Sequence, residues 1–355
     1  MPCVAWDPLA AGYRRQARMT ALPHSPWLAP VLAAVLSALA LGLLARARGL
    51  LPQDQPSGRS LHDRPVTRAG GLAIWAGFLP VALLSPSPIA GGPGWLVAWA
   101  MVTAVSVADD WIGVRPPLRL AVHTLAALAV AASLLRPDGA ERVSLPLVLA
   151  IIGTALAIVW AANLFNFMDG NDGLAAVMAI CGFGAFGVAS MRAGIRPDVY
   201  FALAAATSVF LVVNLPPARS FMGDGGSVGL GFLAAVFGFS GIRAETWPGW
   251  FPLLVFLPFV ADATLTVLRR LARGDHLFEA HRTHYYQRLH RMGSGHRGTL
   301  GFYGVLIVGT SASALFALVV APAAGWYVLA AWIVAIGALF AGIDYHWRRR
   351  SPEQQ

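Results

Sequence analysis

Residues 298–343 read GTLGFYGVLIVGTSASALFALVVAPAAGWYVLAAWIVAIGALFAGI and contain no charged side chain. A membrane-spanning helix needs about 20 mostly apolar residues, so this stretch is long enough for two spans, divided at Ala321-Pro-Ala-Ala-Gly325. Residues 69–108 are also free of charge and hold two more spans, divided near Gly91-Gly-Pro-Gly94. These two stretches predict a polytopic, all-α integral membrane protein.

The composition of the whole chain agrees with this class. Only 12% of its 355 residues are charged and 57% are hydrophobic, whereas a soluble domain carries about 25% charged residues. A soluble enzyme, a coiled coil and a disordered tail are therefore excluded. The two cysteines, Cys3 and Cys181, lie far apart and indicate neither a disulfide framework nor a metal cluster.

Windows without charge predict eleven spans and three parts of the chain. The parts are an N-terminal tail (1–26), a transmembrane domain (27–345) and a C-terminal tail (346–355). The spans are 27–45, 70–89, 93–108, 119–135, 145–162, 173–191, 199–214, 226–242, 249–268, 299–320 and 326–344.

The arginines predict the sidedness of the bundle. All 26 basic residues are arginine, and the loops on one side carry 18 of them, counting Arg119 with its adjacent loop, against 8 on the other. The Arg-rich side is expected to be cytoplasmic, which puts the N-terminus outside. Since membrane topology accounts for the basic residues, we expect no nucleic-acid partner. Either Met1 or Met19 is the start; a signal peptide over residues 14–47 is the weaker alternative.

Almost every polar cluster falls on the Arg-rich side. A transporter would carry ionisable groups near the membrane midplane, so this gathering favours an enzyme that joins a cytosolic substrate to a lipid headgroup. Asp109-Asp110 ends one predicted span, where the two carboxylates repel each other unless a cation lies beside them. A solvated helix terminus is the alternative for this pair.

The run Asn163-Leu-Phe-Asn166-Phe-Met-Asp169-Gly-Asn-Asp172-Gly173 is the most specific cluster. In a helix, Asn163 and Asn166 share a face, and so do Asn166 and Asp169. Their oxygens are hard ligands that suit Mg²⁺. The alternative is an Asx-rich turn with capping roles.

Two more clusters follow. In Phe221-Met-Gly-Asp224-Gly-Gly-Ser227 the N-terminus of the next helix would favour an anion while Asp224 holds a cation; a plain N-cap is the alternative. The loop 269–298 offers His281-Arg-Thr-His284 for phosphate and base contacts. Its alternative is membrane topology and binding of anionic lipid, which suits the arginines at 269, 270 and 273.

Two carboxylates lie inside predicted spans. An ionisable group within a span is functional by default, but for Asp262 an internal salt bridge is an equal alternative. For Asp344 we expect an ion pair with Arg348, four residues later.

Taken in order, five motifs resemble the polyprenyl-phosphate N-acetylhexosamine-1-phosphate transferases, or glycosyltransferase family 4. The resemblance covers residues 27–345 and is nearest to the branch that initiates O-antigen chains. The motifs are Arg59-Ser-Leu-His62-Asp-Arg64-Pro-Val-Thr-Arg68-Ala-Gly-Gly71, Asp109-Asp110-Trp-Ile-Gly113, the Asn163–Gly173 run, Phe221–Ser227 and His281-Arg-Thr-His284.

The resemblance implies a role for single residues. Asp224 and Asn166 would bind Mg²⁺, or Mn²⁺ in its place. The catalytic carboxylates would be Asp109, Asp110 and Asp169. The residues that bind the nucleotide sugar and its phosphates would be Asn163, Asp172, His281, Arg282, His284, Arg59, His62, Arg64 and Arg68.

The implied reaction transfers a sugar-1-phosphate from a UDP-amino sugar to undecaprenyl phosphate and releases UMP, at the cytoplasmic face of a bacterial inner membrane. The sugar, the glycan pathway, a one-step or covalent two-step route and a homodimer are left open. Tyr285 stands where many relatives have histidine, and Thr67 where many have proline. A run of consecutive histidines, typical of the phospho-N-acetylmuramoyl-pentapeptide transferases, is absent, although that activity is the main alternative and a transporter the remote one.

Overall fold

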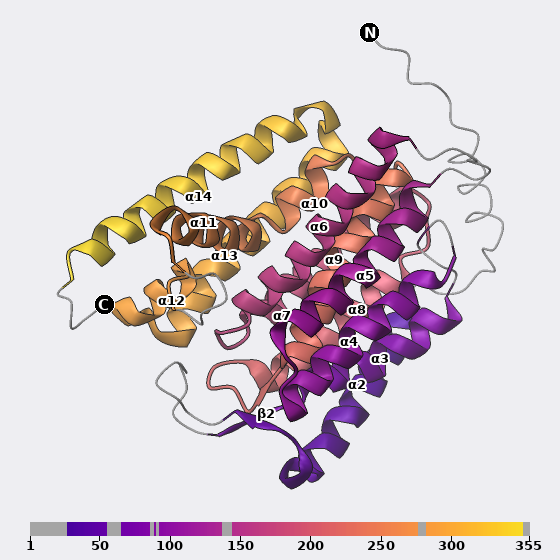
Figure 1. Ribbon diagram of the computed structural model, residues 1–355, viewed down its shortest axis with the longest axis horizontal. Helices are drawn as coiled ribbons and strands as arrows, with labels where there is room; N and C mark the ends of the chain where they lie inside the picture. The colour runs from indigo at the N-terminus through magenta and orange to yellow at the C-terminus, as the bar shows by residue number, and fades with distance from the viewer. Residues whose placement is uncertain are drawn as a thin grey trace.

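The computed structural model describes residues 27–54, 65–85, 89, 92–136, 144–275 and 282–350. These residues form a bundle in which most helices run side by side (Figure 1). The helices are α2 (Leu28–Arg46), α3 (Gly70–Leu84), α4 (Gly94–Ile112), α5 (Pro116–Leu135), α6 (Leu145–Met168), α7 (Leu174–Arg192), α8 (Asp198–Asn214), α9 (Asp224–Arg243), α10 (Trp250–Val255), α11 (Leu257–Arg273), α12 (Tyr285–Leu289), α13 (Gly295–Val320) and α14 (Gly325–Arg348).

The predicted class, a polytopic all-α membrane protein, is confirmed. Among the described residues, eight helices are long and apolar enough to cross a membrane, and one of these runs from α12 through α13. Helices α3 and α8 are apolar but contain only 15 and 17 residues. The count of eleven spans is therefore not confirmed.

The ninth predicted span, 249–268, is broken in the structure. Helix α10 ends at Val255 and α11 begins at Leu257, with Pro258 in its first turn. Proline lacks an N–H and its ring clashes with the preceding helical turn, so it kinks or breaks a helix that would pass through it. The break gives α11 its own start, and α11 carries the buried Asp262.

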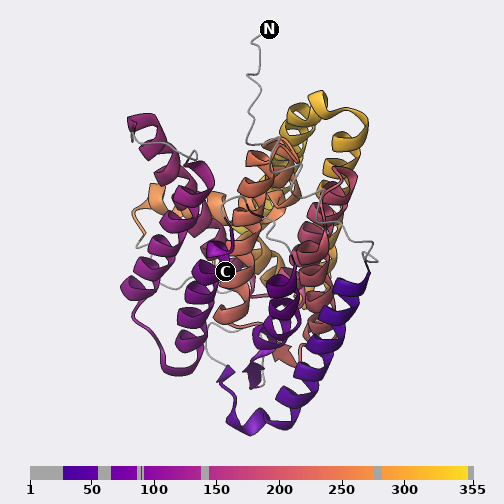
Figure 2. The same ribbon diagram turned by 90° about the vertical axis from the view of Figure 1, so that its right-hand side faces the viewer.

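Helix α9 lies in the middle of the bundle, between α4 and α6, as two views at right angles show (Figures 1 and 2). Its glycines allow this close packing. A Cβ at Gly231 would lie 2.3 Å from the carbonyl oxygen of Ala161 on α6, and one at Gly229 would lie 2.6 Å from the ring of Trp75 on α3. Larger residues at these two positions would force the helices apart.

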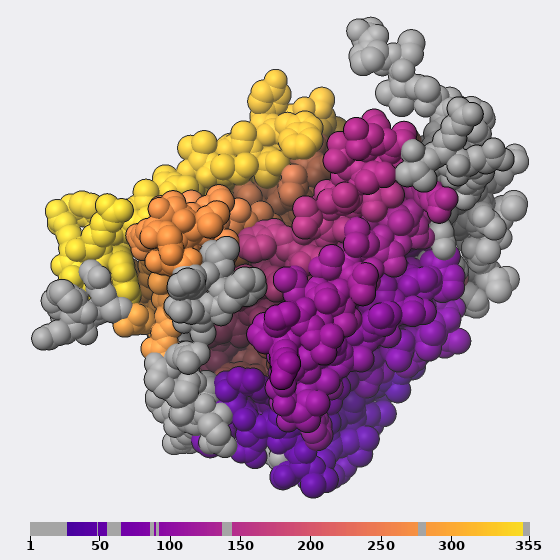
Figure 3. Space-filling model, viewed as in Figure 1, coloured from indigo at the N-terminus to yellow at the C-terminus, as the bar shows by residue number. Residues whose placement is uncertain are grey.

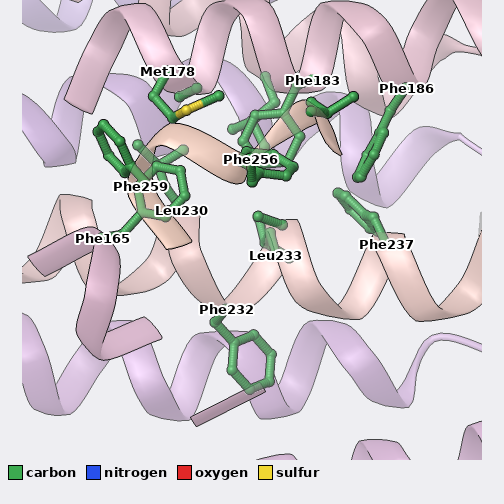
Figure 4. Packing of buried hydrophobic residues seen from close by; sticks show 14 of the residues in the cluster. Phe165, Met178, Phe183, Phe186, Leu230, Phe232, Leu233, Phe237, Phe256 and Phe259 are labelled. Atoms are coloured by element: carbon green, nitrogen blue, oxygen red, sulfur yellow. The ribbon is translucent and has the colours of Figure 1, made fainter. Parts of the chain in front are cut away.

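Aromatic side chains fill the space between α9 and its neighbours (Figure 4). Phe183 of α7 meets Phe237 of α9 edge to face, with ring centroids 6.2 Å apart, and Phe165 of α6 meets Phe259 of α11 at 5.2 Å. Such edge-to-face contacts are favourable beyond the area they bury. This packing holds the ends of α6 and α9 in fixed relative positions.

A small sheet was not part of the sequence-based prediction. Strands β1 (Gln53–Asp54), β2 (Val66–Arg68) and β3 (Ser220–Phe221) pair in that order. The pair β1–β2 is antiparallel and the pair β2–β3 is parallel. Strands of two or three residues leave no periodic pattern to detect. The sheet ties the segment before α3 to the segment before α9.

Candidate active site

Asp224, the first residue of α9, lies where the ends of four helices meet. Asn166, in the last turn of α6, donates its Nδ2–H to Asp224 Oδ1 over 2.9 Å. Arg119, in the first turn of α5, donates Nη1–H to Asp224 Oδ2 over 2.9 Å and also to Asp109 at the end of α4. Arg119 therefore bridges two predicted site carboxylates. The sequence had indicated this arginine only as a topological charge.

Asp110 holds the N-terminus of α9. Its Oδ1 accepts the backbone N–H of Asp224 (3.1 Å) and its Oδ2 accepts that of Gly225 (2.9 Å). The side chain is only 5% exposed, so this is not a solvated helix terminus. The N-terminus of α9 was expected to favour an anion, and the carboxylate of Asp110 occupies its first two N–H groups.

Gly223 makes this contact sterically feasible. Its φ is +75°, which glycine adopts readily, and a Cβ there would lie 2.7 Å from Asp110 Oδ2. On the other side, Gly71 donates its N–H to the carbonyl of Met222 over 2.9 Å. The glycines of two predicted motifs thus bring the start of α3 and the start of α9 together.

Arg68 reaches the same group from β2. Its Nη1 lies 4.0 Å from Asp110 Oδ1, and its Nη2–H donates to Asp54 Oδ1 over 2.6 Å. The side chain is 39% exposed, so it stands at the open edge of the cluster. Its guanidinium is available there for contact with an anion as well.

Asp169 directly follows α6, and its carboxylate accepts no hydrogen bond from the described residues. Burial raises the pKa of Asp169 well above its usual range, and repulsion from the carboxylates of Asp224 and Asp110 raises it further. Asp109 adds a fourth carboxylate to the region. Under these conditions a bound cation would stabilise the ionised form of the cluster.

The donor set fits Mg²⁺. This ion usually takes one or two protein carboxylates and completes its shell with water and substrate phosphates. Among the described residues, no group of three or more His, Cys, Asp or Glu side chains is placed to hold a metal. Asn166 acts here as a donor, to Asp224 and over 3.2 Å to Ser227 Oγ, so its role as a metal ligand stays a prediction.

Two other residues of the 163–173 run bind the protein itself. Asn163 donates its Nδ2–H to the carbonyl of Val159, one turn earlier in α6, over 2.8 Å. Asp172 accepts the backbone N–H of Ala218 over 2.9 Å, and its Oδ1 lies 3.4 Å from His296 Nδ1. These contacts fasten the turn after α6, and sugar-binding roles for both residues stay predictions.

Asp262 organises the segment that carries His284. Its carboxylate is fully buried and accepts the backbone N–H groups of Tyr285 (2.9 Å) and Tyr286 (3.0 Å) and the hydroxyl of Tyr303 (2.5 Å). His284 Nδ1 lies 3.2 Å from the same carboxylate. Asp262 therefore lies beside a histidine but accepts its other hydrogen bonds from neutral donors. The sequence did not indicate these neutral donors.

Tyr286 connects this segment to the acidic cluster, the group formed by the carboxylates of Asp109, Asp110, Asp169 and Asp224. Its hydroxyl donates to the carbonyl of Phe167 in α6 over 3.0 Å. The next glycine, Gly170, leaves room for the ring, because a Cβ there would lie 2.2 Å from the tyrosine oxygen. His284 and the residues after Asn166 are therefore neighbours in the fold.

Asp344 does not pair with Arg348 as expected. Its two oxygens bind Nη1 of Arg269 (2.5 Å) and Nη1 of Arg288 (2.6 Å) instead, because α11 and α12 pack against the end of α14. Arg282 lies two residues before His284 at the edge of the described chain. The predicted site residues that lie outside the described residues are Arg59, His62, Arg64 and His281.

The sequence is similar to those of a known family and of several named relatives. The model of the family "Glycosyl transferase family 4" matches residues 93–242. This range contains Asp109, Asp110, Asp169 and Asp224 and also Arg119, but not Arg68. A decaprenyl-phosphate N-acetylglucosaminephosphotransferase of Mycobacterium leprae is 31% identical over 311 residues, covering 75% of this chain and 77% of the relative.

Two further relatives are similar over most of the chain. A probable undecaprenyl-phosphate N-acetylglucosaminyl 1-phosphate transferase of Bacillus subtilis is 28% identical, covering 69% of this chain and 71% of the relative. An undecaprenyl-phosphate alpha-N-acetylglucosaminyl 1-phosphate transferase of Yersinia pestis is 28% identical, covering 75% of each.

Proposed function

Because this chain belongs to glycosyl transferase family 4, we propose that it transfers N-acetylhexosamine-1-phosphate from a UDP-sugar to undecaprenyl phosphate. A phosphate oxygen of the lipid forms a bond to the sugar-bearing phosphorus. The bond from that phosphorus to the UMP part breaks, and UMP leaves. The product is a sugar joined to the lipid through a diphosphate.

One observation carries the proposal: Asp224, Asp110, Asp169 and Asp109 gather at one end of the bundle with Arg119 and Arg68 beside them. The acceptor phosphate is largely dianionic at neutral pH, with a second pKa of about 6, so it needs little help from a general base. The difficulty is to bring one anion to another, and positive groups at fixed positions relieve it.

The chain's own residues divide this work. Arg119 is held between Asp109 and Asp224, so its charge has a fixed place near the reacting phosphates. Arg68 stands at the open edge, where an incoming phosphate first meets the cluster. Asp110 fixes the start of α9 and with it the position of Asp224.

Mg²⁺, or Mn²⁺, held by Asp224 with Asp169 nearby, would neutralise the diphosphate when bound. Asn166 supports this group through its hydrogen bond to Asp224. We place the cluster at the cytoplasmic face of a bacterial inner membrane, since it lies on the Arg-rich side. Reporter fusions after Gly113 and Arg297 should both report cytoplasm.

The names of three relatives support N-acetylglucosamine as the sugar. Initiation of an O-antigen chain is the pathway we propose, on the likeness of the Arg59–Gly71 segment to that branch. A muramoyl-pentapeptide substrate would instead call for the histidine run that this sequence lacks.

The test uses purified protein with UDP-N-acetylglucosamine, UDP-N-acetylgalactosamine or UDP-N-acetylmuramoyl-pentapeptide, each with radiolabelled undecaprenyl phosphate and Mg²⁺. Equal amounts of UMP and lipid-linked sugar from an N-acetylhexosamine donor support the proposal. Product only from the pentapeptide donor, or no UMP from any donor, contradicts it. Asp198→Asn is the matched control, because Asp198 is 8% exposed, paired with Arg196 and at the far end of α8.

A further inference from the structure

A cavity of about 390 Å³ lies between the ends of α11, α12 and α14. Its wall includes Arg269 and Arg273 of α11, Arg288 of α12, and Asp344, Trp347 and Arg348 of α14. None of these residues belongs to the acidic cluster. Figure 3 shows the last turns of α14, in yellow, beside the orange segment that carries α12.

The cavity wall is strongly positive. Four arginines face one carboxylate, Asp344, whose oxygens are already taken by Arg269 and Arg288. Arg273 and Arg348 have no acidic partner among the described residues. Among the described residues, three of the four positive charges around this concave space are therefore left uncompensated, which is an arrangement that attracts an anion.

Arg288 adds an independent observation. Its side chain is 9% exposed, and its Nε–H is buried without a hydrogen-bond acceptor among the described residues. A buried donor without an acceptor is costly. Nη1 is bound to Asp344, and the residue lines the cavity, where its charge adds to those of the other three arginines. A guanidinium presents its N–H donors at a spacing that matches two phosphate oxygens.

The guanidinium is held in place rather than free to swing. Arg288 Cζ lies 5.3 Å from the ring centroid of Tyr285 and 5.9 Å from that of Trp347. Tyr285 in turn stacks on Phe340 with centroids 4.0 Å apart. A rigid donor loses little freedom on binding, so this cavity is organised before a ligand arrives.

The position of the cavity also fits a membrane surface. It surrounds the last turn of α14, a helix long and apolar enough to span a membrane, and Trp347 lies in its wall. Tryptophan and arginine at the end of a spanning helix are typical of the level of the lipid headgroups, and arginines there are attracted to anionic lipids.

We propose that this cavity binds a phosphate group, which a membrane lipid headgroup or a soluble anion would supply. The fold links the ligand to the proposed reaction only indirectly. Arg288 lies in the same short helix as Tyr286, whose hydroxyl contacts α6 beside the acidic cluster. The proposal stands on the cavity alone and does not require that the transferase activity be correct.

The experiment compares the wild-type protein with Arg273→Gln/Arg348→Gln and with Arg288→Gln. The double variant removes two exposed side chains without acidic partners, so it is expected to fold. Arg46→Gln/Arg115→Gln is the matched control, because it removes two exposed arginines from the same end of the bundle.

Protein in nanodiscs of phosphatidylcholine, with or without phosphatidylglycerol, is analysed by native mass spectrometry for retained phosphatidylglycerol. In a second arm, inorganic phosphate is titrated into the phosphatidylcholine discs and the thermal shift is recorded.

We expect phosphatidylglycerol to stay bound to the wild type and the control, and its retention to fall about tenfold for each arginine removed from the cavity. The same pattern with inorganic phosphate instead would support the cavity and identify a soluble ligand. Equal binding by the wild type and the cavity variants, or binding of neither probe by the wild type, would overturn the proposal.

Discussion

The buried carboxylate of Asp262 and the four partly buried carboxylates near the start of α9 have opposite surroundings. Asp262 accepts hydrogen bonds from two backbone N–H groups and the hydroxyl of Tyr303, and lies beside His284. At the start of α9, Arg119 binds Asp109 and Asp224, Arg68 lies 4.0 Å from Asp110, and Asp169 has no donor among the described residues. The first arrangement is saturated and holds the chain together. The second contains mutually repelling carboxylates, which raise the pKa of Asp169 beyond the effect of burial, and a cation would relieve that repulsion.

The sharpest test of this contrast is Asp224→Asn. It removes the carboxylate on which the proposed metal depends but relieves repulsion among the carboxylates. We expect turnover to fall by at least about 10²-fold, while the melting temperature without Mg²⁺ stays near the wild-type value. The measurement is UMP release across a range of Mg²⁺ concentrations.

The control for this variant is Asp198→Asn, which should leave turnover and metal dependence unchanged. If Asp224→Asn kept the metal dependence of the wild type, the ion would have to sit on Asp109, Asp110 or Asp169. Asp224 would then not be the residue that distinguishes the metal-dependent carboxylates from Asp262.

Asp262→Asn should give the reverse result. The amide has one oxygen, so it cannot accept both backbone N–H groups and the tyrosine hydroxyl, and its own NH₂ faces donors. We expect the free energy of unfolding to fall by about 2–4 kcal/mol, with a smaller loss of turnover in molecules that remain folded. Thermal unfolding in detergent, with and without Mg²⁺, measures it. A wild-type melting temperature would show that the saturated network does not stabilise the fold.

Asp110→Asn should affect both turnover and stability, because Asp110 faces the site and also binds the first N–H groups of α9. We expect both quantities to drop: turnover by about tenfold or more, and the free energy of unfolding by about 1–2 kcal/mol. Asp109→Asn, which keeps that helix start intact, should reduce turnover with a smaller change in stability. Near-normal turnover in both variants would reduce the pair to a helix terminus.

How far the sequence predicted these regions follows from the kind of signal each one leaves. Long charge-free stretches predicted the membrane class, and the Asp and Asn runs predicted which loops hold the carboxylates. Those signals are local. The bridge by Arg119 to Asp224 joins residues 105 positions apart, and only the packing of α5 against α9 and α4 reveals it.

The same reason explains the other differences. The sequence left two interpretations of Asp262, a functional role or an internal salt bridge. Its partners come from α12 and α13, and no local pattern places these helices beside it. Asp344 was expected to pair within its own helix, but tertiary partners replaced the local one. The ninth span broke because Pro258 outweighed an apolar window that hydropathy alone treats as continuous.

Asn166→Ala should have a moderate effect. It removes the hydrogen bonds to Asp224 and Ser227 without removing a carboxylate. We expect turnover to fall by about tenfold and excess Mg²⁺ or Mn²⁺ to restore part of it, since Asp224 stays in place but is less well oriented. The assay is UMP release at low and high metal. No rescue by metal would indicate that Asn166 contacts the substrate instead.

Tyr303→Phe should have the smallest effect and tests the saturated group most directly. It removes one donor from Asp262 and leaves both backbone N–H bonds in place. A single hydrogen bond to a charged group contributes about 1.5–3 kcal/mol, but the remaining donors share the carboxylate, so we expect a loss near the lower value. The metal dependence of turnover should not change, because Tyr303 has no contact with the acidic cluster. A change in the Mg²⁺ concentration needed for turnover, with unchanged stability, would show that Asp262 acts together with the acidic cluster. The two sets of carboxylates would then be one site.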